Sequence, residues 1–153
     1  MNQIISRLKE RNETISTAES ITAGGIANKL TSIPGASAVF VGGVVAYQNQ
    51  IKINELKVNA DLIAQKTPVS KEVVEAMASG AKEKFGTTWA IATTGVAGPD
   101  SLAGHQPGEV WIAIAGPVSQ SFQLNLTGGR EEIRAKTISM ALETLTNILD
   151  SRK

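Results

Sequence analysis

The chain has 153 residues and a nearly balanced charge, with 15 Lys and Arg against 14 Asp and Glu. A chain of this length buries roughly 70% of the surface that it exposes when unfolded, so we expect one domain with its own core. The balanced charge gives no excess of cations to release counterions from a nucleic acid, which is therefore not an expected partner. The absence of cysteine excludes disulfides, a thiolate nucleophile and cysteine-based zinc sites.

Hydropathy gives no sign of a membrane-spanning segment. The longest apolar runs, at 38–41 and 44–46, are far shorter than the roughly 20 residues of a membrane helix. The N-terminal segment soon reaches polar residues and has no signal-peptide pattern, so we expect a cytoplasmic protein that does not contact membranes. The single histidine, His105, has no ligand-spaced partners, so we expect no metal site and place it at the surface or at a substrate rim.

Periodicity and turn residues divide the chain into helices and strands. In chain order, we expect a helix at 2–12, a strand at 14–18, a helix at 24–30, a strand at 38–47, helices at 51–56 and 71–84, strands at 89–94, 109–115 and 120–126, and a helix at 130–149. Asn49 and Ser70 are the expected caps of the helices that follow them. The continuously apolar segment 38–47 predicts a fully buried strand, in which Gly42-Gly43 marks a bulge or a close backbone approach.

This order of elements predicts an α/β fold, a three-layer single domain with a mixed, mostly parallel sheet flanked by helices. The hairpin of the last two strands is what makes the sheet mixed. In such sheets, ligands bind on loops beyond the carboxyl ends of the strands. The loops after the strands at 14–18 and 89–94 are therefore the first places to search for chemistry.

The loop after the first strand combines hydroxyl groups and glycine just before a helix. Ser20, Thr22 and Gly24 lie where free backbone N–H groups and the helix dipole can receive an anion. The alternative is that Ser20 or Thr22 only caps the helix.

The loop after the strand at 89–94 is the second candidate. Thr94, Gly95, Gly98 and Pro99 can cradle a phosphate with hydroxyl and backbone N–H groups. No Gly-Lys-Ser/Thr follows them, so this is not a P-loop, and neither loop has a full dinucleotide-binding fingerprint. Glycine loops of this kind are also common as ordinary turns.

Two further candidate groups lie outside these loops. Tyr47 ends the second strand five residues before Lys52, although a strand-end aromatic with a solvated lysine is the alternative interpretation. Arg130 and Arg134 are one helical turn apart and can hold a phosphate together. The glutamates between them favour a salt-bridged surface helix instead.

Taken together, these segments form a recognisable pattern. In order along the chain, they are Ala18-Glu19-Ser20-x-Thr22-x-Gly24, Val45-Ala46-Tyr47-x-x-x-x-Lys52, Pro68-Val69-Ser70, Gly95-Val96-Ala97-Gly98-Pro99 and Gly129-Arg130-Glu131-x-Ile133-Arg134. The pattern resembles the CinA C-terminal family, the nicotinamide mononucleotide deamidases, over about residues 5–149. Many relatives carry an additional N-terminal domain, and we expect this module to stand alone.

The resemblance implies hydrolysis of nicotinamide mononucleotide to nicotinic acid mononucleotide and ammonia, without a metal or an organic cofactor. It places Ser20 at the nucleophile position and Tyr47 and Lys52 at the family's tyrosine and lysine. A lysine in a low-dielectric pocket has a depressed pKa and can take the serine proton. Whether Lys52 or Tyr47 is the immediate base is left open. N–H groups of the loop after Ser20 are expected to bind the oxyanion.

The resemblance also implies a mononucleotide as the small-molecule partner and a homo-oligomer, a dimer or larger. Three segments depart from the family pattern: Ile21 with Ala23, Thr67-Pro68, and the loop 100–108. The intact trio favours an enzyme over the alternative, a nucleotide-binding regulatory module without turnover. Hydrolysis of another small amide or nucleotide is a third interpretation, because the loop 100–108 is atypical.

Overall fold

The computed structural model describes residues 2–152. Its elements in chain order are α1 (Asn2–Glu10), β1 (Ile15–Glu19), α2 (Gly25–Thr31), the 3-10 turn η1 (Ala36–Ala38), β2 (Phe40–Val45), α3 (Asn49–Leu56), α4 (Ala60–Lys66), α5 (Lys71–Phe85), β3 (Trp89–Gly95), β4 (Glu109–Ala115), β5 (Gln120–Asn125) and α6 (Arg130–Ser151). The strands form a five-stranded sheet in the order β2-β1-β3-β4-β5.

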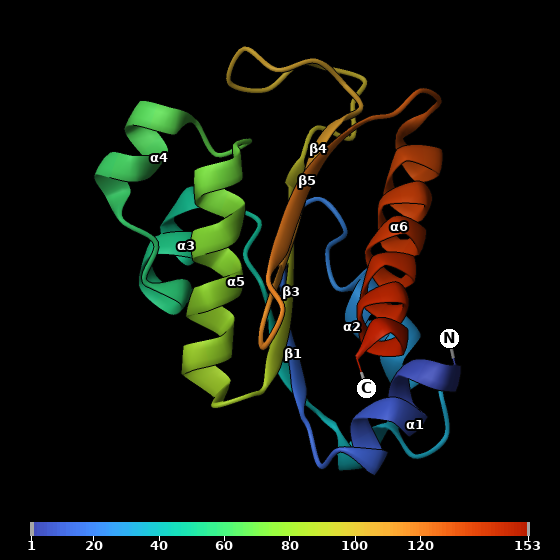
Figure 1. Ribbon diagram of the computed structural model, residues 1–153. Coiled ribbons are helices and arrows are strands. Elements are labelled where there is room, and N and C mark those ends of the chain that lie inside the picture. The colour runs from blue at the N-terminus through green and yellow to red at the C-terminus, as the bar shows by residue number, and fades with distance from the viewer. Residues whose placement is uncertain (1, 153) are drawn as a thin grey trace.

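Helices cover both faces of this sheet. Figure 1 shows α3, α4 and α5 on one side and α1, α2 and α6 on the other. One apolar core lies under α1, α2 and α6, where Ile15, Trp89 and Leu145 are fully buried. A second core lies under α5, where Met77 and Ala92 are fully buried. The predicted three-layer α/β architecture is therefore confirmed, because each face of the sheet buries apolar side chains against its own helices.

The sheet is mixed, as predicted, but its pairings are evenly divided. Strand β1 pairs in parallel with both β2 and β3. Strand β4 pairs antiparallel with both β3 and β5. The expectation of a mostly parallel sheet therefore needs correction. The chain passes from β3 to β4 through a loop without a crossover helix, and two neighbouring strands joined in this way run antiparallel.

Strand β2 is an edge strand, and the prediction that it is fully buried is wrong. Its residues alternate between partly buried and exposed, and the side chains of Val41 and Val45 are 53% and 50% exposed. Apolar runs do not distinguish a central strand from an edge strand. The expected close backbone approach at Gly42-Gly43 is confirmed, because a Cβ on Gly43 would collide with Thr17 Oγ1. The register with β1 shifts one residue earlier, at Val41.

Most predicted helix boundaries hold to within one or two residues, and Ser70 caps α5 by accepting a hydrogen bond from the Val73 N–H at 3.3 Å. Helix α3 begins at Asn49, two residues earlier than expected, so its N-cap is Gln48 and not Asn49. No element was predicted for α4, although Asn59 caps it through bonds to two backbone N–H groups. The signal for α4 was this asparagine, which precedes a short apolar stretch.

The topology determines where a ligand site can form. The three parallel strands β2, β1 and β3 end at the same edge of the sheet. From β1 the chain crosses to β2 on one side, whereas β3 lies on the other side of β1. Such a switch point opens a crevice between the loops that follow β1 and β3. Within residues 2–152, no helix is long and apolar enough to cross a membrane.

Candidate active site

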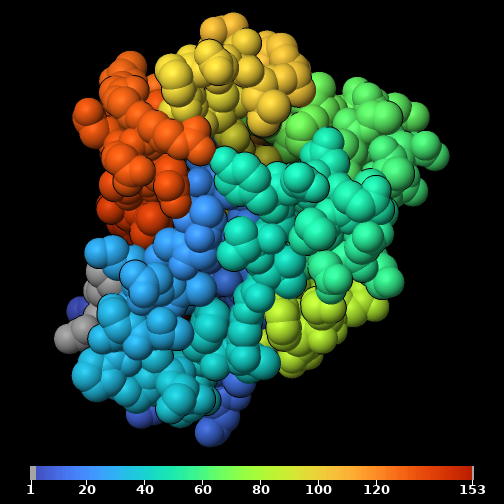
Figure 2. All heavy atoms as spheres, turned by 180° about the vertical axis from the view of Figure 1, so that it is seen from behind, coloured from blue at the N-terminus to red at the C-terminus, as the bar shows by residue number. Residues whose placement is uncertain are grey.

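A pocket with a volume of about 350 Å³ lies at this edge of the sheet. Its walls come from the loops after β1, β2 and β3 and from the start of α6. The lining residues are Ser20, Ile21, Tyr47, Gly95, Val96, Ala97, Gly98, Pro99, Asp100, Ser101, Leu102 and Arg130. Figure 2 shows the loop after β3 in yellow, the segment after β2 in cyan and the start of α6 in orange meeting on one face. Pockets of roughly 300–1,000 Å³ are typical of small-molecule sites.

The side chains of Ser20 and Lys52 are in contact at this edge of the sheet. Lys52 Nζ lies 3.3 Å from Ser20 Oγ, and it also donates to the backbone carbonyls of Ala46 at 3.0 Å and Tyr47 at 3.4 Å. The Lys52 side chain is only 2% exposed, so the alternative of a solvated lysine is wrong. Helix α3 brings Lys52 back under the end of β2, which explains the spacing between Tyr47 and Lys52.

Burial controls the protonation of this lysine. It lowers the pKa of Lys52 from its ordinary value of 10.5 to about 8, because a charged ammonium loses hydration in the interior. A lysine with this pKa is partly neutral near physiological pH. The neutral amine has a lone pair and can accept the Ser20 proton.

Glu19 organises the loop that carries Ser20. Its buried carboxylate accepts hydrogen bonds from the Thr22 hydroxyl at 2.6 Å and from the backbone N–H groups of Ile26 at 2.7 Å and Ala27 at 3.1 Å. The N-terminus of α2 therefore already holds an anion, which belongs to the chain itself. The expectation that this helix start receives a substrate anion needs correction.

Neither Ser20 nor Thr22 caps α2, so that alternative is also wrong. The N-cap is Gly24, which has a φ of +91° and makes no side-chain cap bond. This left-handed conformation favours glycine. The hydroxyl of Thr22 bonds to Glu19 and, at 2.8 Å, to the Thr93 hydroxyl, so Thr22 is a buried residue that stabilises the loop. It does not line the pocket.

Tyr47 and Arg130 meet at the mouth of the pocket. Arg130 Nη2 donates to the Tyr47 hydroxyl at 2.9 Å, and Arg130 Nη1 donates to the carbonyl of Gly98 at 2.6 Å. The Tyr47 side chain is 57% exposed. Its hydroxyl therefore bonds to an arginine at the rim, whereas Lys52 is the group within hydrogen-bonding distance of Ser20.

The glycine loop after β3 forms one wall. Gly95, Gly98 and Pro99 line the pocket, whereas the Thr94 hydroxyl points away from it and donates to the Pro68 carbonyl at 2.7 Å. A Cβ on Gly95 would meet the Glu109 carbonyl at 2.8 Å, so the close approach of β4 requires glycine there. This loop and Arg130 remain the candidate receptors for a phosphate.

Arg134 lies apart from the pocket lining. Its Nη2 donates to the Thr22 carbonyl at 3.5 Å and its Nη1 lies 3.6 Å from a Glu131 carboxylate oxygen. Its Nε is buried and has no hydrogen-bond partner among the described residues. The salt-bridge interpretation therefore fits Arg134, and the phosphate interpretation fits Arg130 better.

The sequence patterns assigned no structural role to several residues at the site. Glu19 directly precedes Ser20, but its bonds to α2 depend on how the loop folds. Residues 100–102 line the pocket, and their only signal in the sequence was that the loop departs from the family pattern. His105 contacts Thr67 and Glu109, and the only local signal was the spacing of four residues between His105 and Glu109.

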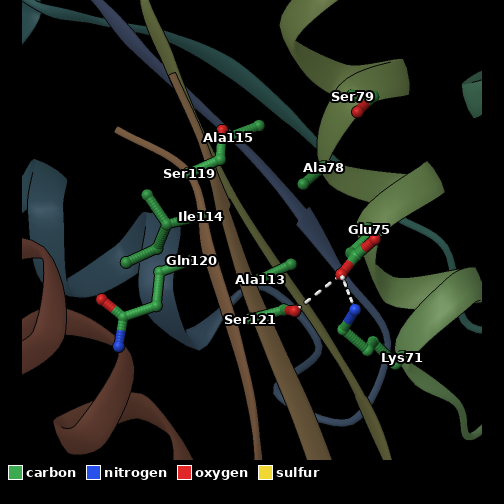
Figure 3. A pocket seen from close by; sticks show the side chains of 10 residues that line it. All are labelled: Lys71, Glu75, Ala78, Ser79, Ala113, Ile114, Ala115, Ser119, Gln120 and Ser121. Atoms are coloured by element: carbon green, nitrogen blue, oxygen red, sulfur yellow. Dashed lines mark hydrogen bonds and ion pairs between the residues drawn. The ribbon is translucent and has the colours of Figure 1, made fainter. Parts of the chain in front are cut away.

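A second pocket, with a volume of about 370 Å³, lies between α5 and the strands β4 and β5. Figure 3 shows Glu75 bridging Lys71 and Ser121 at its centre. The Ser121 hydroxyl and then Lys71 hold the pKa of Glu75 below its ordinary value. Lys71 and Glu75 are exposed, and the lowered pKa makes the Glu75 carboxylate a poor base for the Ser121 hydroxyl, so this pocket is the weaker candidate for catalysis. Within residues 2–152, no group of three metal-ligating side chains could hold a metal ion.

Fold and site together define an α/β domain with a buried serine–lysine pair at the carboxyl edge of a mixed sheet. Residues 1–149 match the model of the CinA C-terminal domain. The chain belongs to the CinA C-terminal domain family, which confirms the resemblance drawn from its motifs.

Curated relatives and solved structures agree with this assignment. A CinA-like protein of Synechocystis is 44% identical over 149 residues, which cover 94% of this chain and 36% of the relative. One from Prochlorococcus marinus is 46% identical over 146 residues, which cover 93% of this chain and 34% of the relative. The chain therefore spans about a third of the length of the curated relatives it matches.

Two crystal structures superpose over nearly the whole chain. The competence damage-inducible protein A of Klebsiella pneumoniae aligns with a TM-score of 0.92 at 30% identity, covering 99% of this chain and 98% of that one. The competence/damage inducible protein CihA of Agrobacterium tumefaciens aligns with a TM-score of 0.92 at 35% identity, covering 97% of this chain and 92% of that one.

Replacing Glu19 by Gln tests how the Ser20 loop is held. The amide keeps the shape but loses the charge, and its NH₂ group faces a donor, so we expect the free energy of unfolding to fall by about 1–3 kcal/mol. Denaturant titration measures this change. Glu131→Gln, at an exposed ion pair with Arg134, is the control and should stay within about 0.5 kcal/mol of wild type. Equal stability of Glu19→Gln and wild type would disprove the anchoring role.

Proposed function

We propose that this protein hydrolyses the carboxamide of nicotinamide mononucleotide to nicotinic acid mononucleotide and ammonia. Membership of the CinA C-terminal domain family supports the class of chemistry. The single observation that carries the proposal is the buried Lys52 Nζ, 3.3 Å from the hydroxyl of Ser20 in the wall of a pocket. A hydroxyl beside a lysine of lowered pKa is an arrangement suited to nucleophilic attack on an amide.

The reaction proceeds in two halves. In the first, neutral Lys52 takes the Ser20 proton while Oγ bonds to the amide carbon, and the resulting tetrahedral intermediate loses ammonia, which receives that proton from Nζ. The product of this half is an ester between Ser20 and the nicotinoyl group. In the second half, Lys52 takes a proton from water, the hydroxide adds to the ester, and the C–Oγ bond breaks. Ser20 regains its proton and the acid leaves.

The contacts of Lys52 favour it over Tyr47 as the immediate base. Lys52 Nζ is at hydrogen-bonding distance from Ser20, whereas the Tyr47 hydroxyl is engaged with Arg130. Tyr47 and Arg130 are instead placed to contact the substrate at the mouth of the pocket. Arg130 and the glycine loop at 95–99 offer the planar donors and backbone groups that a phosphate requires.

Ammonia release from nicotinamide mononucleotide by the purified protein tests this proposal. We expect Ser20→Ala to lower turnover by at least about a thousandfold, because the nucleophile is lost, while nucleotide affinity remains. Ser37→Ala, which changes an exposed serine outside the pocket, is the control and should stay within a few-fold of wild type. Retention of more than about a tenth of wild-type turnover by Ser20→Ala would disprove the nucleophile assignment. A wild-type protein that binds the nucleotide without releasing ammonia would favour a regulatory module.

The pKa of Lys52 predicts how activity depends on pH. Only the neutral amine can act as a base, so kcat/KM should rise about tenfold per pH unit below about 8 and level off above it. Steady-state assays of ammonia release across this range measure the profile. Lys52→Arg keeps the charge but does not deprotonate, and it should abolish the activity and with it the profile. A wild-type rate that is independent of pH below 8 would exclude Lys52 as the base.

The anion receptors predict a preference for the nucleotide over nicotinamide riboside, which lacks only the phosphate. We expect kcat/KM to be about 10- to 100-fold higher for the nucleotide, because charge-assisted hydrogen bonds to Arg130 are lost with the riboside. Arg130→Ala should remove most of this preference, and Arg134→Ala should retain it. Equal values for the two substrates in the wild type would reject the phosphate site and the proposed substrate.

A further inference from the structure

His105 joins three elements next to the pocket. Its Nε2 lies 2.6 Å from the Thr67 hydroxyl, and its Nδ1 lies 2.6 Å from a carboxylate oxygen of Glu109. Thr67 ends α4, Glu109 begins β4, and His105 belongs to the loop between β3 and β4. Both ring nitrogens therefore bond to side chains of other elements.

The partners of His105 are themselves held in place. The Thr67 hydroxyl also lies 3.3 Å from the Val69 carbonyl, to which it can donate. His105 and then the backbone of Gln106 hold the pKa of the Glu109 carboxyl below its ordinary value. Thr67 has a φ of +68°, which is costly for a β-branched residue and persists only when surrounding contacts enforce it.

This contact is linked to the pocket through a short hairpin. Leu102 and His105 exchange two backbone hydrogen bonds, at 3.0 and 2.8 Å. Ala103 and Gly104 between them have φ values of +51° and +83°, as in a two-residue hairpin turn. Leu102 lines the pocket, as do the two residues before it. In the described chain, the hydrogen bonds that tie residues 100–105 to other elements are the two made by the His105 ring.

We propose that His105 is a positioning residue that fixes residues 100–102 as the outer wall of the pocket and so determines substrate affinity. The inference rests on the proposed function for the identity of the substrate. Wall residues that are free to move must be ordered when the ligand binds, and this ordering weakens affinity. The chemical step depends on Ser20 and Lys52, which His105 does not contact. Loss of the His105 bonds therefore affects KM and leaves kcat largely unchanged.

The experiment combines hydrogen exchange with kinetics. His105→Ala removes both bonds, and Thr67→Val removes one hydroxyl while keeping the β-branched shape. Thr67→Ser keeps the hydroxyl and is the matched control. Asp150→Asn breaks the exposed ion pair with Arg7, 3.2 Å long and near the chain termini, and controls for a general effect on stability. Amide exchange of residues 100–106 is measured without ligand, and KM and kcat are measured with nicotinamide mononucleotide.

We expect His105→Ala to accelerate exchange of residues 100–106 by about tenfold or more, because these amides then exchange from an open loop. We also expect its KM to rise about fivefold or more, with kcat within about twofold of wild type. Thr67→Val should show a smaller change of the same kind, and both controls should resemble wild type. Unchanged exchange in His105→Ala overturns the proposal, as does faster exchange with an unchanged KM or a kcat that falls as much as KM rises.

Failure of the proposed function gives a different result. If the wild type binds the nucleotide but releases no ammonia, the function is wrong, and the dissociation constant measured by calorimetry then replaces KM in the same comparison. If the wild type neither binds nor hydrolyses the nucleotide, the inference about its affinity is overturned together with the function.

Discussion

The burial of the Lys52 ammonium group is the constraint on which the site depends. A cation with 2% exposure needs acceptors in place of water, and here two backbone carbonyls and the Ser20 hydroxyl provide them. This requirement fixes α3 against the end of β2, because the carbonyls of Ala46 and Tyr47 must face the amine. A neutral amine has two hydrogens for the two carbonyls, which leaves its lone pair for Ser20. These contacts therefore suit Lys52 to the role of base that we propose for it.

Two anionic groups must be held near Ser20: the carboxylate of Glu19 and the phosphate of the proposed substrate. The carboxylate of Glu19 occupies the start of α2 and fixes the backbone on which Ser20 stands. A second anion at the same helix start would be repelled. The phosphate of the proposed substrate is therefore expected at Arg130 and the glycine loop, which line the pocket, whereas the residues of α2 do not. Separation of these two regions allows one end of a ligand to be held while the other reaches Ser20.

Local signals in the sequence explain what could be predicted. The helices other than α4 and the central strands follow from apolar periodicity, and the serine–lysine pair was predicted from motifs that resemble those of the CinA C-terminal family. Strand β2 was misjudged because Val41 and Val45 look the same in an edge strand as in a buried one. The contacts of Glu19 depend on how the loop after β1 folds, and the contact of His105 with Thr67 depends on how distant segments fold together. His105 meets Thr67 across 38 residues of chain, and no local pattern encodes such a contact.

The antiparallel strand β4 has a consequence for how sites of this kind can diversify. Since β4 starts at the edge where β3 ends, the intervening segment leaves the sheet and returns to it at the same edge. This segment is a loop whose two ends join the adjacent strands β3 and β4, and it contains no helix. Residues can be inserted or exchanged along this loop without moving the strands that carry Ser20. Ligand preference and chemical capability can therefore evolve independently in this architecture.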